Sequence, residues 1–151
     1  MFRQLVLISV VMLTLEVALI TRATAQSAEV CSFTLVNSGE LVGDGGVLPT
    51  KLVSLNSNGG SPMQISINCK EPVNISVSEP IQIAGPAFQP VSSLVTVQTA
   101  FASSTNSRGG SPLTLPVGTT PVFINLFVDK GSLLVPGNYK YEVKFIIVPQ
   151  S

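Results

Sequence analysis

Apolar and polar residues alternate along most of this 151-residue chain, as they do in β-strands with one buried face. The alternation is clearest in MQISINC, where Met63, Ile65, Ile67 and Cys69 fall on one side. Glycine, proline and asparagine clusters separate such runs. We predict strands at 30–36, 47–55, 63–69, 73–77, 93–101, 113–117, 122–128 and 139–148.

These predicted strands differ in quality. The 47–55 run is weak, or a pair of short pieces broken at Pro49, and Pro116 breaks the 113–117 run. Consecutive apolar residues in 122–128 predict a strand buried on both faces. We predict a turn at 43–46 and a loop at 102–112, both rich in glycine or serine. Beyond the N-terminal run no segment has a helical period, so the fold class is all-β, an antiparallel sandwich.

The first 25 residues have the pattern of a signal peptide. Arg3 gives a positive start, residues 5–15 form a largely apolar run without charge, and Ala23-Thr24-Ala25 fits the small-residue cleavage pattern. Glu16 ends the apolar run well short of the roughly 20 residues that a membrane-spanning helix needs. We therefore predict export to the periplasm, cell surface or extracellular space, without a transmembrane anchor, and one domain over residues 26–151.

Charge limits the partners of this domain. With Arg3, Arg22 and Glu16 removed, 6 basic and 7 acidic residues remain, so the net charge is about −1. Such a surface does not attract nucleic acid or anionic lipid. Uncharged polar residues dominate instead, which is typical of exported β proteins.

Cys31 and Cys69 are the two cysteines of the chain, and each falls on the apolar face of a predicted strand. A cysteine pair in an oxidising compartment is typical of a disulfide. The alternative is a redox-active or metal-binding pair, which usually has closer spacing or further ligands. The chain has no histidine and no third cysteine, so a structural disulfide is favoured.

The sequence points to no reaction. Without histidine the commonest general base and metal ligand at neutral pH is missing. The acidic residues are scattered, and no spacing suggests a carboxylate pair, a phosphate-binding loop or a calcium loop. We predict no catalytic residue, no metal ligand, no cofactor and no enzyme activity.

Several separate segments resemble a known group. A cysteine in the first strand (VCSFTL) is followed by an alternating strand that ends in cysteine (ISINC), then by VNISVS. The chain closes with a PGNY turn that leads into YEVKFIIV. Together these segments resemble the secreted spore coat protein U family and the wider group of chaperone–usher pilin subunits.

This resemblance implies an incomplete Ig-like sandwich that lacks its final strand. A periplasmic chaperone, and later a neighbouring subunit, would fill the open groove by strand addition. After Val148 three residues remain, too few for another strand. Alternation with polar residues places Tyr139, Val143, Phe145 and Ile147 on the inner face of this last strand. The resemblance places that face beside the groove of a pilus-like (fimbrial) or surface-coat subunit.

The sequence departs from this group at one point. A donor segment needs ten or more alternating residues before the first cysteine, and residues 26–30 are too few. We therefore expect the domain to accept a strand without donating a full one. The alternative function is an extracellular carbohydrate- or ligand-binding module, for which the absence of tryptophan and the presence of two tyrosines give little aromatic material.

Overall fold

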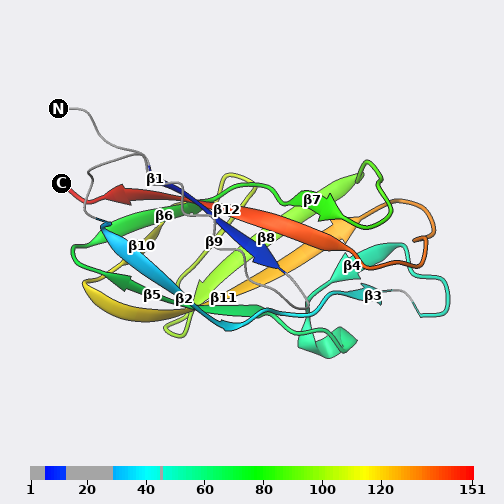
Figure 1. The fold of residues 1–151 in the computed structure, drawn as a ribbon, viewed down its shortest axis with the longest axis horizontal. Coiled ribbons are helices and arrows are strands. Elements are labelled where there is room, and N and C mark those ends of the chain that lie inside the picture. Colours follow the sequence, from blue (N-terminus) through cyan, green and yellow to red (C-terminus); the bar gives the residue numbers. More distant parts are fainter. Residues whose placement is uncertain (1–5, 13–28, 45) are drawn as a thin grey trace.

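The computed structural model describes residues 6–12, 29–44 and 46–151, and these form a β-protein (Figure 1). A single 3-10 turn, η1 (Asn56–Asn58), is the helical element within these ranges. The strands are β1 (Val6–Met12), β2 (Cys31–Asn37), β3 (Val42–Asp44), β4 (Lys51–Val53), β5 (Met63–Cys69), β6 (Val73–Val77), β7 (Ile81–Ala84), β8 (Ser92–Thr99), β9 (Ser104–Asn106), β10 (Leu113–Leu115), β11 (Gly118–Asp129) and β12 (Lys140–Pro149).

The strands make two antiparallel sheets. The first sheet has the order β1-β12-β6-β10, and β7 also pairs with β12. The second has the order β2-β5-β11-β4-β3, and β8 pairs with both β11 and β9. The prediction of an all-β antiparallel sandwich is confirmed.

β11 is the central strand of the second sheet. β5 pairs with its first half and β4 with its end, while β8 covers the other edge. Its inner residues, from Thr120 to Val128, are buried, and the residues between them are half-buried. The prediction of burial on both faces is therefore wrong in degree, because the outward side chains of β11 are only partly covered.

The two sheets enclose one apolar core, and alternate residues of the long strands supply it. Phe33 of β2 stacks on Phe145 of β12 with ring centroids 6.4 Å apart, which joins the sheets face to face. Phe33 and its neighbour Leu35 are only half-buried. This follows from their position, because β2 forms one end of the second sheet.

The predicted disulfide is present. Cys31 and Cys69 are directly opposite one another in the β2–β5 pair, with Cα atoms 4.0 Å apart. Both residues are buried in the core cluster. The bridge therefore fixes the register of the first two strands of the second sheet.

Several predicted boundaries are wrong, and β11 begins at Gly118 instead of residue 122. The segment 43–46 begins within β3, because Gly43 and Asp44 pair with β4, and the left-handed turn residue is Gly46. The 47–55 run keeps only β4 as strand, and Val47 is 96% exposed.

The predicted 102–112 loop contains β9, because Ala102 adopts a positive φ of 63° and turns the chain back onto β8. The strand β7 was not predicted, since prolines and a glycine flank its four residues.

Candidate functional site at the edge of the last strand

The last strand, β12, is paired along both of its edges. β6 and β7 share one edge, and β1 covers the other, from Val6 opposite Ile147 to Met12 opposite Tyr141 (Figure 1). β1 lies within the apolar run of the predicted signal peptide, whereas Arg3 and the cleavage motif at 23–25 lie outside the described residues. The expected open edge is thus filled in the full chain, by residues that the sequence predicts to be removed.

The inner face of β12 carries the core side chains predicted for the groove. Val143, Phe145 and Ile147 are buried, as is Tyr141, which precedes them in the same alternation. In a β-pair, directly opposed residues lie on the same face of the sheet. A strand paired like β1 therefore presents every second residue to the core, at the positions opposite these four side chains.

Tyr139, the fourth predicted groove residue, lies just before β12 and is half-buried. Its ring packs edge-on against Phe88 at 5.9 Å, and its hydroxyl donates a hydrogen bond to the Val135 carbonyl. Burial raises the pKa of Tyr139 above 10.0, and the hydrogen bond to Val135 opposes that shift. Tyr139 thus holds the preceding loop and does not contribute to the paired edge.

Tyr141 has a different environment. Its side chain is 3% exposed, and its hydroxyl has no hydrogen-bond partner among the described residues. Burial, followed by the nearby Tyr139, raises the pKa of Tyr141 to about 12. Tyr141 marks the end of the β1–β12 pairing, opposite Met12.

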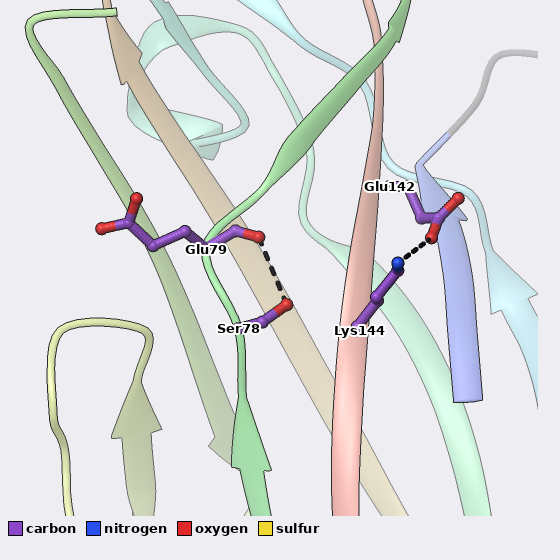
Figure 2. Close-up of polar contacts among 4 residues, drawn as sticks. All are labelled: Ser78, Glu79, Glu142 and Lys144. Atoms are coloured by element: carbon purple, nitrogen blue, oxygen red, sulfur yellow. Dashed lines mark hydrogen bonds and ion pairs between the residues drawn. The ribbon is translucent and has the colours of Figure 1, made fainter. Parts of the chain in front are cut away.

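The outer face of β12 is charged in its first half. Figure 2 shows Lys144 and Glu142 on this strand, joined by an ion pair of 3.6 Å, with β1 alongside. On the other side of β12, just after the end of β6, the Ser78 hydroxyl donates a hydrogen bond of 3.2 Å to the Glu79 carbonyl (Figure 2). Both side chains of the ion pair are partly exposed, and such pairs contribute at most about 1 kcal/mol. Their main effect is to place charge beside the sheet edge, which opposes uncontrolled edge-to-edge association.

A cleft of about 600 Å³ lies near the start of β12. Its walls are mainly apolar and come from residues 39–41, 43, 47–49 and 52 and from residues 133–139, which include Tyr139. Leu48, Leu133 and Val135 are each more than half exposed there. The volume is in the range of small-molecule sites, and Glu40 is the charged residue of the lining.

The described residues contain no group of three or more acidic or cysteine side chains placed to hold a metal ion. Over the same residues, no helix has both the length and the apolar character required to cross a bilayer.

Comparison with protein-family models, with curated proteins and with solved structures finds no match to this chain.

Sequence reasoning identified part of this site. The period of two placed Val143, Phe145 and Ile147 on the inner face of β12, and the same parity includes Tyr141. Tyr139 shares that parity but lies just before the strand, which begins at Lys140. The pairing of β12 with β7 is also irregular, between Lys140 and Tyr141. The occupant of the edge was missed. The apolar pattern of Val6–Met12 is compatible both with a signal peptide and with a β-strand.

Proposed function

We propose that residues 26–151 form an exported, non-enzymatic interaction module. It binds a partner protein by accepting one strand along the edge of β12 that pairs with β1. The observation that carries this proposal is the β1–β12 pairing. That edge is covered by seven residues of the predicted signal peptide, paired with Tyr141 to Ile147. Removal of the leader would leave the backbone N–H and C=O groups of this edge without partners, a state that favours strand addition.

The inner face supports the same proposal. With β1 in place, Val143 and Phe145 are fully buried. An uncovered edge would bring water next to these side chains and next to the half-buried Phe33, which stacks on Phe145. Covering apolar area stabilises a protein by about 25 cal/mol per Å², so a partner strand would gain from apolar contacts as well as from backbone hydrogen bonds.

The register also defines the partner strand. It is antiparallel to β12 and carries apolar residues opposite Tyr141, Val143, Phe145 and Ile147. Its alternate residues face the charged side of β12, where an acidic residue would complement Lys144. The resemblance to spore coat protein U and chaperone–usher subunits supports an Ig-like subunit of a pilus-like or surface-coat assembly. Its partners would then be a periplasmic chaperone or a neighbouring subunit.

A strand peptide provides the test. The oxidised domain 26–151 is mixed with a labelled VLISVVM peptide that carries charged tags for solubility, and binding is followed by fluorescence anisotropy and by Tm. We expect saturable binding and a rise in Tm, because a ligand that binds only the folded state stabilises it.

Two altered peptides serve as matched controls. Aspartate in place of Val10, opposite the buried Val143, abolishes binding, whereas aspartate in place of Ser9, opposite Lys144, preserves it. A cooperative monomer whose Tm none of these peptides changes would rule out strand acceptance.

A further inference from the structure

From the β1–β12 pairing we infer that the signal peptide of this protein also acts as an internal substitute strand, which keeps the uncleaved precursor unable to bind its partner. This inference rests on the proposed function, because it concerns the same acceptor edge. In the full chain the edge is occupied over seven consecutive register positions, without a bulge. The precursor is therefore the closed form of the molecule, and the processed domain is the open form.

The sequence of the paired segment fits this second role. The residues opposite the buried side chains Ile147, Phe145, Val143 and Tyr141 are Val6, Ile8, Val10 and Met12, and all four are apolar. The intervening position opposite Lys144 is Ser9. A signal peptide needs only a continuous apolar run. Such a run also supplies an apolar residue at every second position, so the same residues can serve as a leader and as a strand paired in this register.

Covalent connection makes the substitute strand effective. A segment tethered to its own domain acts at an effective concentration on the order of 1 mM. If a free strand of equal quality binds the open edge with a Kd of about 10 μM, the tethered segment would weaken its apparent binding about 100-fold. A partner at micromolar concentration would then not displace β1 from the precursor.

Cleavage removes this advantage. Hydrolysis of the predicted Ala25–Gln26 bond by a signal peptidase consumes one water molecule, leaving a carboxylate on Ala25 and an amino group on Gln26. The leader fragment is then held only by non-covalent contacts and dissociates on dilution. Removal of the leader would thus expose the binding edge.

The test compares the full chain 1–151, refolded with its disulfide formed, with the domain 26–151. Binding of the labelled VLISVVM peptide is measured, together with amide hydrogen exchange over residues 141–147. We expect the full chain to bind the peptide about 100-fold more weakly and to protect this segment more strongly. Val10→Asp in the full chain should restore peptide binding to within a few-fold of the short form, while the matched Ser9→Asp variant should remain closed.

The possible failures are distinguishable. Equal peptide binding and equal exchange in the two forms would overturn the internal-strand inference and leave the proposed function intact. If neither form binds the peptide but residues 141–147 are protected only in the full chain, the internal strand stands and strand acceptance by the processed domain is wrong. Loss of protection in Ser9→Asp as well as Val10→Asp would also count against pairing in the observed register.

Discussion

The hydroxyl oxygen of Tyr141 lowers stability although the rest of the side chain packs in the core. Its ring belongs to the core, yet its hydroxyl is buried with no hydrogen-bond partner among the described residues. Tyr139, two residues earlier, has its hydroxyl bonded to a backbone carbonyl. An unsatisfied buried polar group costs about 1–3 kcal/mol, so the two tyrosines contribute differently to stability despite their proximity.

We predict that Tyr141→Phe makes the full chain as stable as the parent or about 1 kcal/mol more stable at pH 7, because the substitution removes only the unpaired hydroxyl. Urea unfolding measures this difference. Tyr139→Phe is the control, and it should destabilise the chain because a hydrogen bond to Val135 is lost. A clear loss of stability in Tyr141→Phe would show that its hydroxyl does have a partner.

The pH dependence of stability tests the same residue. An unfolded tyrosine loses its proton near pH 10, whereas burial holds the pKa of Tyr141 at about 12 in the folded chain. The stability that this shift confers is fully present below pH 10 and is lost as the pH rises from 10 to 12. Unfolding curves across this interval should therefore fall less steeply for Tyr141→Phe than for the parent chain, and parallel curves would contradict the raised pKa.

At the scale of the elements, the sequence predicts strands that bury one face and misses strands that do not. β5, β6 and β12 were predicted to within about a residue, since each alternates core and surface residues. β7 and β9 were missed because neither buries a regular apolar face. Ile81 and Ile83 are exposed, and β9 consists of Ser104, Thr105 and Asn106. The pairing of these strands depends on the neighbouring chain, which local sequence does not encode.

The candidate site was predictable to a similar extent. The alternation along β12 predicted which of its residues face the core. No local pattern predicted which strand lies beside it. Val6–Met12 and β12 are at opposite ends of the chain, and a register between such segments is set by the tertiary fold.

The loop between β7 and β8 depends on Gly85. Its φ is +97°, and a Cβ at this position would lie 2.6 Å from the Asn138 carbonyl oxygen, in the turn before β12. Gly118, at the start of β11, has a similar φ of +101° but open space around it. Both glycines therefore need a left-handed backbone, but only Gly85 also leaves no space for a side chain.

We predict that Gly85→Ala lowers the free energy of unfolding by about 2–5 kcal/mol, because left-handed strain and a backbone clash add together. Gly118→Ala, the matched control, should cost only about 1–2 kcal/mol. Urea denaturation of both variants makes the comparison. Equal losses would mean that the turn at Asn138 shifts freely to accept the methyl group.

At the scale of the whole molecule, the disulfide acts mainly on the unfolded chain. Cys31 and Cys69 are 38 positions apart, so the bridge closes a long loop in every unfolded conformation. The chain-entropy estimate for a loop of this length is about 4 kcal/mol. That is a large share of the roughly 5–15 kcal/mol by which an ordinary domain is stable.

We predict that the double variant Cys31→Ala/Cys69→Ala loses about 4 kcal/mol of stability in urea unfolding while keeping its strand content by circular dichroism. The reduced parent protein should behave in the same way as the double variant. If reduction leaves the unfolding midpoint unchanged, the bridge contributes nothing to stability.

The position of β11 has a consequence for biosynthesis. This strand is the centre of the second sheet and begins only at Gly118, while its partners β4, β5 and β8 all precede it in the chain. A ribosome or translocation pore delivers the polypeptide from its N-terminus, so those earlier strands must wait, with their apolar faces uncovered, until residue 129 has emerged. The nascent chain therefore spends most of its delivery time vulnerable to proteases and self-association, and its folding is completed late rather than progressively.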